Sequence, residues 1–328
     1  MKRILVNGFG RVGRALFRIL EQNGGPKVAH INDPLPLEQL AYLLEYDSVM
    51  GRFDGEIAID DSMLVVNGRK IRVSHATMLG TAEVDGTDIV VNSSGRDNER
   101  ENLEHILKSG AKRVIVSHPL PEGVADRTIL RGINDSDLQA DDRIISAGSC
   151  TAHCFASPLI AINANWPILR GYMMTVHSYT SAQNIVDGGH DKDPRRGRAG
   201  AQNIVPTTTA SLSAFEQAVP ELAGKLTGMA QRVPVVNGSN VELVLELQGE
   251  VSAQEINDTV KQASEGEFQG ILEYSTAPLV SSDIIGNPNS SIFDSLLTHT
   301  QKGETTLARV YLWYDNEWGY TNRLAELL

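Results

Sequence analysis

The stretch "RILVNGFGRVGRALFRILEQNGG", residues 3–25, decides the fold of the first half of the chain. An apolar run over residues 3–7 predicts a buried strand, and a glycine-rich loop follows it. Apolar side chains then recur at helical spacing along one stripe: Val12, Ala15, Leu16, Ile19 and Leu20. The pair Gly24-Gly25 ends this helix. A strand, a tight loop and an amphipathic helix in this order are typical of a parallel sheet covered by helices.

The segments that follow continue this alternation. Four of them read as buried strands, namely "KVAHIND" (27–33), "DIVVNSSG" (88–95), "RVIVSHP" (113–119) and "RIISAG" (143–148). Between two of these strands, "ERENLEHILKSG" (99–110) reads as a helix. "MLVVNGRKIRV" (63–73) predicts a hairpin, because Asn67-Gly68 suits a tight primed turn. We therefore expect an α/β fold whose N-terminal part is a doubly wound parallel sheet.

The pattern changes after residue 149. Longer strand patterns follow, in "GYMMTVHSYT" (171–180), "GMAQRVPVVNGS" (228–239), "ELVLELQGE" (242–250) and "LARVYLWYD" (307–315). Helices are expected at 154–165, around 210–224 and at 253–264, and a polar loop at 187–203. This order predicts a C-terminal α+β domain, residues 150–315, with a mostly antiparallel sheet. Residues 1–149 form the first domain, and the helical segment "WGYTNRLAELL" (318–328) suits packing on either one.

Composition limits the classes of partner. The chain has 328 residues, with 41 acidic and 29 basic side chains and a net charge of -12. This charge argues against a nucleic-acid or anionic-membrane binder, so anionic ligands need local arginines or backbone N–H groups. No apolar run approaches the ~20 residues of a membrane span. The first glycine, Gly8, comes too early for a signal peptide, and we expect a cytoplasmic protein.

The glycine loop carries a ligand-binding pattern. Gly8, Gly10 and Gly13 make G-x-G-x-x-G between the predicted strand and helix, and Asp33 ends the next strand 20 residues after Gly13. This context is the dinucleotide fingerprint of a Rossmann-type domain. The glycines let the backbone approach a pyrophosphate at the helix N-terminus, and Asp33 accepts hydrogen bonds from the adenosine ribose. The alternative is a tight strand-to-helix turn without a ligand.

Both cysteines lie in "ISAGSCTAHCFASP", residues 145–158. Cys150 follows a strand and opens a helix, where the N–H groups and the helix dipole can lower a thiol pKa. Cys154, one turn later, is expected in the core. A metal site using Cys150, His153 and Cys154 has poor spacing for zinc, and an i, i+4 disulfide on a helix is strained. One nucleophile and one bystander is the interpretation that we adopt, without a metal.

A thiol nucleophile needs a base, and His177 at the end of the strand in "TVHSYT" is the candidate. A hydrogen-bonded core histidine is the alternative. With these motifs, "NGFGRVGR", "SCT..C", "RRGRAGAQNIVPTTT", "ELAGKLTGMAQRVP" and "WYDNEWGY", the chain resembles the phosphorylating glyceraldehyde-3-phosphate dehydrogenases over residues 7–320. The resemblance implies an NAD domain of residues 1–149 completed by the C-terminal helix 316–328, a catalytic domain of residues 150–315, and a homotetramer.

The resemblance also implies a reaction. Cys150 attacks the aldehyde carbon of glyceraldehyde 3-phosphate, and His177 takes the proton. The hemithioacetal gives hydride to NAD, and inorganic phosphate releases the thioester as 1,3-bisphosphoglycerate, a step of glycolysis. The implied cofactor-binding residues are Gly8, Gly10, Arg11, Val12, Gly13, Asp33 and Asn316, the last of which holds the nicotinamide amide.

Two phosphates have implied sites. Thr180 and Arg232, with Arg195 of the "PRRGR" segment, resemble the residues that hold the substrate's own phosphate. Ser149, Thr151 and Thr209, with Ala210 beside them, resemble those that hold inorganic phosphate. Hydroxyl groups and arginine side chains are suited to phosphate oxygens.

Several positions depart from the family pattern. His153 replaces an asparagine, and it either lowers the pKa of Cys150 or only packs. Ala210 replaces a glycine, Leu120 replaces a serine, and "GRDN" (95–98) replaces an aromatic pair. The basic residue that precedes "DP" in the family has no counterpart at the matching place near Ser74. Gly188-Gly189 stand where strictly NAD-dependent relatives carry Leu-Pro, so NADP could be tolerated, although a plain turn is the alternative.

Three alternatives stay open at this point. Erythrose-4-phosphate dehydrogenase shares "SHP" (117–119), but it generally lacks the "TTT" that this chain retains at 207–209. Arsenate can replace phosphate at the second site. From another class, a cofactor-sensing homologue with little activity would keep the fold, but it would not need to retain Cys150, His177, Thr180 and Arg232 together.

Overall fold

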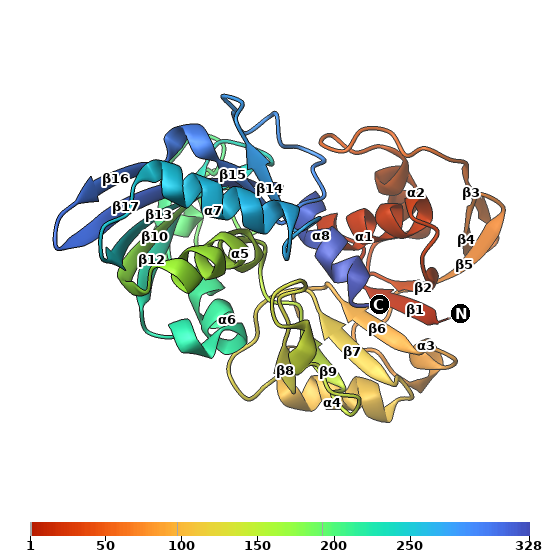
Figure 1. Cartoon of the computed structure of the whole chain (residues 1–328). Coiled ribbons are helices and arrows are strands. Elements are labelled where there is room, and N and C mark those ends of the chain that lie inside the picture. The colour runs from red at the N-terminus through yellow and green to blue at the C-terminus, as the bar shows by residue number, and fades with distance from the viewer. Residues whose placement is uncertain (1, 97, 192) are drawn as a thin grey trace. The chain divides into compact units, whose positions relative to one another are not determined.

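The computed structural model describes residues 2–96, 98–191 and 193–328. Asp97 of the "GRDN" segment and Lys192 of the polar loop therefore lie outside the described residues. The chain forms two compact units (Figure 1). The first runs to Gly148 and includes Thr321–Leu328, and the second is Ser149–Tyr320. In the described part of the chain, no helix is long and apolar enough to cross a membrane.

The first unit contains a nine-stranded sheet in the order β3-β4-β5-β2-β1-β6-β7-β9-β8. Its strands are β1 (Arg3–Asn7), β2 (Lys27–Asn32), β3 (Ile57–Asp60), β4 (Met63–Val66), β5 (Arg69–Ser74), β6 (Ile89–Asn92), β7 (Arg113–Val116), β8 (Arg127–Thr128) and β9 (Ile144–Ser146). All pairs from β5 to β8 along this order are parallel, whereas β3, β4 and β5 pair antiparallel. The predicted α/β class with a doubly wound sheet is confirmed.

Helices cover this sheet. They are α1 (Arg11–Gln22), α2 (Leu37–Glu45), α3 (Thr81–Val84) and α4 (Arg100–Lys108). Leu103, Ile106 and Leu107 of α4 pack with Leu5 and Val90 of the sheet in one buried cluster. Apolar side chains on one stripe of α4 thus form the core predicted from their spacing.

The strand order reverses at β1. The chain moves from β1 to β2 on one side, and it later places β6 on the other side of β1. In such sheets the carboxyl ends of the strands at the reversal point form the ligand crevice. Three asparagines join these ends, because Asn32 Nδ2 donates to Asn7 Oδ1 (2.8 Å) and Asn7 Nδ2 donates to Asn92 Oδ1 (3.0 Å). The glycine loop starts directly after this fixed edge, at Gly8.

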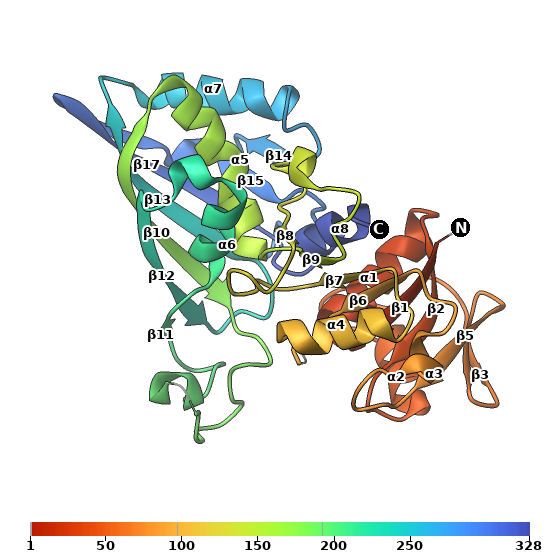
Figure 2. The same cartoon turned by 90° about the horizontal axis from the view of Figure 1, so that it is seen from below.

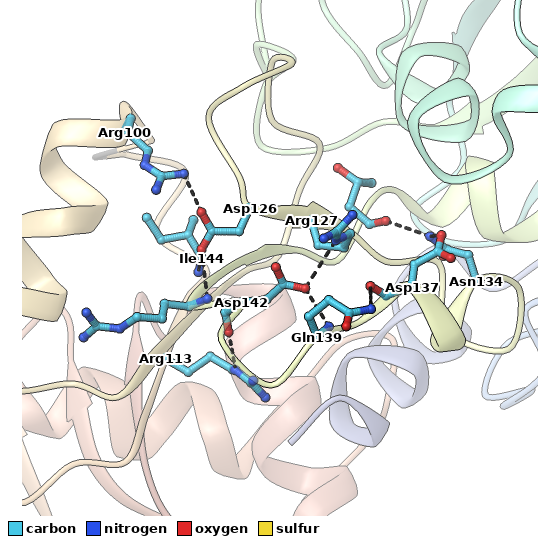
Figure 3. Close-up of polar contacts among 11 residues, drawn as sticks. Arg100, Arg113, Asp126, Arg127, Asn134, Asp137, Gln139, Asp142 and Ile144 are labelled. Carbon is cyan, nitrogen blue, oxygen red and sulfur yellow. Dashed lines mark hydrogen bonds and ion pairs between the residues drawn. The ribbon is translucent and has the colours of Figure 1, made fainter.

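Ion pairs and hydrogen bonds stabilise the side of the sheet that β8 and β9 form (Figure 3). Asp126 accepts from the guanidinium of Arg100 (2.7 Å) and from the backbone N–H of Ile144 (2.8 Å). Asp142 accepts from Arg127 Nε at 3.3 Å. These contacts fix β9, the last strand of the first unit.

The second unit contains an eight-stranded sheet in the order β11-β12-β10-β13-β17-β15-β14, with β16 paired to β17. Its strands are β10 (Ile168–Ser178), β11 (Val205–Thr207), β12 (Leu226–Val233), β13 (Ser239–Gln248), β14 (Leu272–Ser275), β15 (Ser291–Asp294), β16 (His299–Lys302) and β17 (Thr305–Tyr314). Antiparallel pairs predominate, but β10–β12 and β14–β15 are parallel, so the sheet is mixed.

The helices of the second unit lie along one face of its sheet (Figure 2). They are α5 (Cys150–Asn165), α6 (Ser211–Ala218) and α7 (Ala253–Glu265), and α8 (Trp318–Glu326) ends the chain. α5 is apolar around most of its circumference because it contacts β-strands on one side and α6 and α7 on others. The first turn of α5 therefore has a fixed position, and this turn carries Cys150, the candidate nucleophile.

Candidate active site

Cys150 is the first residue of α5 and is half-buried. Ser149 caps this helix, because its Oγ accepts the backbone N–H of Ala152 at 3.0 Å. Cys154 is fully buried, and its Sγ lies 3.9 Å from the carbonyl oxygen of Trp313. Both thiols are free, and among the described residues no group of three or more His, Cys, Asp or Glu could hold a metal ion.

His177 is brought to the thiol by the end of β10. Its Nε2 lies 3.5 Å from Cys150 Sγ, and its Nδ1 lies 2.8 Å from the carbonyl oxygen of Ser178. The carbonyl oxygen can only accept from Nδ1, whereas Nη1 of Arg232, 2.5 Å from Nδ1, can only donate to it. In the tautomer whose proton is on Nδ1, Nε2 presents a lone pair to the sulfur and His177 can accept the thiol proton.

Arg232 stands beside His177 because β10 and β12 pair in parallel with these two residues in register. Its Nη1 donates to the Ser178 carbonyl oxygen (3.1 Å) and lies 2.5 Å from His177 Nδ1. Burial, together with this neighbouring positive charge, lowers the pKa of His177 to about 3. The imidazole is therefore neutral at neutral pH.

Burial also raises the pKa of the Cys150 thiol, although the charge of Arg232 opposes this effect. The helix N-terminus had led us to expect a lowered thiol pKa, and desolvation outweighs it here. Without a ligand, the pair is thus a neutral thiol beside a neutral imidazole.

Two arginines mark an anion site. Burial lowers the pKa of Arg232, and the positive charge of Arg196 nearby acts in the same direction. The Nε atoms of Arg232 and Arg196 are both buried and have no hydrogen-bond partner among the described residues. Two neighbouring guanidinium groups with unused donors suit a phosphate. Arg195, the residue chosen from sequence, is exposed instead, and Arg198 is paired with Asp187 at 2.8 Å.

Thr180 lies in the loop after β10 and is held by a residue that sequence reasoning missed. Gln183 Oε1 accepts from the Thr180 backbone N–H (2.9 Å) and hydroxyl (3.2 Å). Gln183 is buried, and its Nε2 has no partner among the residues that the structure describes. Its place three residues after Thr180 is a turn spacing that could have indicated this contact.

A cluster of hydroxyl groups lies at the N-termini of α5 and α6. Ser149 Oγ and Thr209 Oγ1 both donate to Ser211 Oγ, at 3.0 and 2.9 Å. Ser211 was also missed, although it follows the "TTT" run by only two residues. Ala210 is the N-cap of α6 and gives that helix no side-chain cap. Thr151 is not part of this cluster, because its hydroxyl contacts Tyr314 OH at 2.8 Å.

His153 and Asn316 have defined hydrogen bonds. His153 Nδ1 lies 2.9 Å from the Ser149 carbonyl oxygen, and the ring packs edge-on against Tyr320. Asn316 Oδ1 accepts three hydrogen bonds, from Ser178 Oγ, Ser239 Oγ and the Gly238 N–H. This leaves its amide N–H groups available as donors.

The glycine loop of the first unit fits a dinucleotide. A Cβ on Gly8 would lie 2.5 Å from Ser94 Cα, and one on Gly13 would lie 2.3 Å from the Gly8 oxygen, so both positions need glycine. A Cβ on Gly10 meets nothing within 4 Å, which leaves open space at the N-terminus of α1. Asp33 Oδ2 accepts the N–H of Phe9 at 2.8 Å and Oδ1 that of Leu35 at 3.0 Å.

Arg11 and Val12 begin α1, and both are half-buried. Arg11 forms an ion pair with Asp47. α1 has no side-chain cap at Gly10, and such helix starts bind the pyrophosphate of dinucleotides.

The first unit has a dinucleotide-type loop, and the second has a thiol, an imidazole and two arginines. These are the groups that a nucleotide-dependent dehydrogenase with a cysteine nucleophile would need. Comparisons with known proteins specify the class. Residues 2–100 match the family profile "Glyceraldehyde 3-phosphate dehydrogenase, NAD binding domain", and residues 149–316 match the corresponding "C-terminal domain" profile. The chain belongs to the glyceraldehyde-3-phosphate dehydrogenase family.

Individual relatives are similar over nearly their full lengths. Glyceraldehyde-3-phosphate dehydrogenase 1 of Bacillus subtilis is 45% identical, with 99% of this chain and 96% of the relative covered. The enzymes named glyceraldehyde-3-phosphate dehydrogenase from Priestia megaterium and Geobacillus stearothermophilus are each 44% identical with the same coverage.

Proposed function

We propose that this protein oxidises glyceraldehyde 3-phosphate to 1,3-bisphosphoglycerate, with NAD as the oxidant and inorganic phosphate as the acyl acceptor. The contact of Cys150 Sγ with His177 Nε2, next to Arg232, carries this proposal. The names of the relatives favour glyceraldehyde 3-phosphate over erythrose 4-phosphate, and they favour an enzyme over a cofactor sensor.

His177 accepts the thiol proton as the sulfur attacks the aldehyde carbon, which gives a hemithioacetal. Bound NAD supplies the acceptor for the hydride, and loss of this hydride leaves a thioester on Cys150. Phosphate oxygen then attacks the thioester carbon, the C–S bond breaks, and the sulfur takes the proton back from His177.

Substrate charge helps the first step. A phosphate on Arg232 and Arg196 offsets the positive charge that holds the pKa of His177 low. Binding the substrate therefore favours the protonated form of His177, which is the proton acceptor of the first step. We assign the substrate phosphate to Thr180, Arg232 and Arg196, so Arg196 replaces the Arg195 of the sequence prediction.

The inorganic phosphate belongs at Ser149 and Thr209, beside the backbone N–H groups at Ala210. NAD belongs on Gly8, Gly10, Arg11, Val12, Gly13 and Asp33, with the Asn316 amide donating to the nicotinamide amide. Residues 1–149 with helix 316–328 form the NAD-binding domain in this proposal, and residues 150–315 form the catalytic domain.

Asp33 favours NAD, because its carboxylate would face the 2′-phosphate of NADP. Gly188-Gly189 lack the bulk of a Leu-Pro pair, so we propose that NADP is used weakly. The proposed enzyme acts in glycolysis in the cytoplasm as a homotetramer.

One assay tests the proposal. NADH formation is measured with glyceraldehyde 3-phosphate or erythrose 4-phosphate, each with phosphate, arsenate or neither, and NADP replaces NAD in a parallel series. We expect the highest kcat/KM for glyceraldehyde 3-phosphate with phosphate and NAD. Cys150→Ser should abolish turnover, whereas the matched control Cys154→Ser keeps it. Activity that persists in Cys150→Ser would contradict the mechanism.

A further inference from the structure

We propose that a cavity at the amino ends of the strands of the first unit binds a linear polyphosphate group, as carried by a nucleoside triphosphate or by free inorganic polyphosphate. This site goes beyond the proposed function and is separate from the cofactor and phosphate sites given above. The cavity has a volume of about 360 Å³, which is in the range of small-molecule pockets. Its wall includes six cationic residues: Lys2, Arg3, Lys27, Arg69, Lys70 and Arg72.

The cavity lies at the edge of the sheet opposite to the glycine loop. β1 begins at Arg3, β2 at Lys27 and β5 at Arg69, and these three strands are parallel neighbours. Asn7 and Asn32, at the other ends of β1 and β2, belong to the edge from which the glycine loop starts. A ligand in the cavity therefore leaves free the crevice in which dinucleotides bind.

The charge of the cavity is opposite to that of the chain as a whole. The chain has a net charge of -12, yet no acidic side chain of the described residues lines the cavity. Two carboxylates pair with its cationic groups from outside. Glu21 pairs with Lys27 (3.5 Å) and Arg69 (2.5 Å), and Asp60 pairs with Lys70 (2.5 Å). The positive charge that remains favours a ligand with several negative charges.

Two arginines of the cavity, Arg3 and Arg72, have no carboxylate partner among the described residues. Arg72 Nη1 donates to the carbonyl oxygen of Ala82 in α3 at 2.8 Å. Arg3 Nη1 lies against the turn after α3, because a Cβ added to Gly86 would be 2.6 Å from it. Both arginines are exposed, and their remaining N–H groups can donate to phosphate oxygens in pairs.

A bulge in β2 shapes the cavity between these arginines. The register between β1 and β2 shifts after Ile4, so that Ala29 is an extra residue without a partner on β1. Ala29 lines the cavity with its small side chain, and β2 lies between the strands that carry Arg3 and Arg72. These strands are two spacings apart, about 10 Å. A linear chain of phosphates spans this separation better than a single phosphate does.

A neighbouring cavity of about 290 Å³ provides a contrast. It shares Lys2, whose Nζ donates to an oxygen of Leu328. Its wall contains the carboxylates of Asp88 and Asp142, and Asp88 pairs with Lys112 at 2.6 Å. Carboxylates in the wall repel phosphate oxygens. We therefore assign the polyphosphate to the first cavity alone.

Titration calorimetry with inorganic tripolyphosphate and with ATP tests the site in the full chain saturated with NAD, which keeps both ligands from the glycine loop. Wild type is compared with the variant that combines Arg3→Gln and Arg72→Gln. The matched control combines Lys112→Gln with Arg143→Gln, which removes two exposed positive charges at the neighbouring cavity. Thermal unfolding checks that each variant keeps its fold.

A second measurement locates the ligand. Lysines are acetylated with acetic anhydride, and the labelling of each one is followed by mass spectrometry. Tripolyphosphate should protect Lys27 and Lys70, whereas Lys108 of α4, whose side chain is 76% exposed, should be labelled at an unchanged rate. Inorganic phosphate at the same concentration is the control ligand and should protect neither Lys27 nor Lys70.

We expect the Arg3→Gln and Arg72→Gln variant to bind tripolyphosphate at least about 10-fold more weakly than wild type, because it lacks hydrogen bonds to a charged group. The control variant should keep the affinity of wild type. Tighter binding of ATP than of tripolyphosphate would identify a nucleoside triphosphate as the source of the polyphosphate group, and the reverse order would identify free polyphosphate.

Three results would overturn the proposal. The first is a variant lacking Arg3 and Arg72 that binds tripolyphosphate as tightly as wild type. The second is an equal loss of affinity in the control variant. The third is labelling of Lys27 and Lys70 that tripolyphosphate does not reduce, or that inorganic phosphate reduces as much.

Discussion

Cys150 stands where the dipole of α5 favours a thiolate, yet burial raises the pKa of its thiol. Burial and the charge of Arg232 likewise lower the pKa of His177 to about 3. Both pKa shifts favour a neutral thiol beside a neutral imidazole. The thiol and the imidazole are therefore both expected to be neutral at neutral pH.

The hydroxyl of Thr151 makes a prediction about this thiol. Thr151 Oγ1 lies 3.9 Å from Cys150 Sγ, and this contact lowers the pKa of the thiol against the effect of burial. Thr151→Val removes the hydroxyl and keeps the shape of the side chain, so the pKa of Cys150 should rise further. Because the thiolate is the form that reacts, the curve of iodoacetamide alkylation rate against pH should move to higher pH.

A second variant completes this experiment. Tyr314→Phe removes the other partner of the Thr151 hydroxyl, 2.8 Å away, so the alkylation curve should move to lower pH. Thermal unfolding of each variant checks that the fold is kept. An alkylation curve of Thr151→Val equal to that of wild type would mean that the Thr151 hydroxyl does not stabilise the thiolate.

At the scale of elements, the glycines in the loop between β1 and α1 serve two different purposes, packing and ligand binding. A side chain at Gly13 collides with the Gly8 oxygen, whereas one at Gly10 enters open space in an ordinary backbone conformation. The two glycines are thus needed for different reasons, although the sequence pattern treats them alike.

Matched alanine variants test this difference. Gly13→Ala should lower both the unfolding temperature and the NAD affinity, because α1 must move away from the loop. Gly10→Ala should keep the unfolding temperature and lower NAD affinity at least about 10-fold, since its Cβ fills the space left for the pyrophosphate. Calorimetry measures both quantities. NAD affinity equal to wild type in Gly10→Ala would rule out this loop as the pyrophosphate site.

At the scale of the whole molecule, apolar side chains remain uncovered in the second unit. Ile185 is 90% exposed and Val186 is 73% exposed directly before the polar loop, and Ile204 is 66% exposed directly after it. Leu169 and Tyr172 of β10 are also exposed. Exposed apolar side chains at both ends of one loop suit an association surface, which supports the proposed homotetramer.

Carboxylates introduced at Ile185 and Val186 should dissociate the proposed homotetramer. Ile185→Asp with Val186→Asp places two carboxylates where apolar contacts are expected, and their desolvation is unfavourable. Sedimentation velocity should show a tetramer for wild type and smaller species for the variant. Met78→Asp, at an exposed apolar position of the first unit, serves as the control. A tetramer that survives in the loop variant would place the interface elsewhere.

Much of the fold could be predicted from periodicity. The strand and helix from residue 3 to residue 25, the hairpin at Asn67-Gly68 and the long strands of the second unit follow from local patterns, and Asn67 and Gly68 have the expected positive φ angles of 49° and 76°. β3, β8, β11 and β14 to β16 were not identified, because strands of two to four residues leave too short a pattern.

The sequence by itself determined the order of elements and the glycine loop with Asp33, and it predicted Cys150 with His177 as the reactive pair, because backbone preferences and helix starts are local properties. Only the tertiary structure showed that the charge of Arg196 acts on Arg232, that Ser211 contacts Ser149 and Thr209, and that the Thr151 hydroxyl contacts Tyr314. The direction of a hydroxyl and the pKa of a thiol depend on burial and on charges from other strands. Thr151 and Tyr314 are 163 residues apart in the chain, and no local pattern places them 2.8 Å from each other.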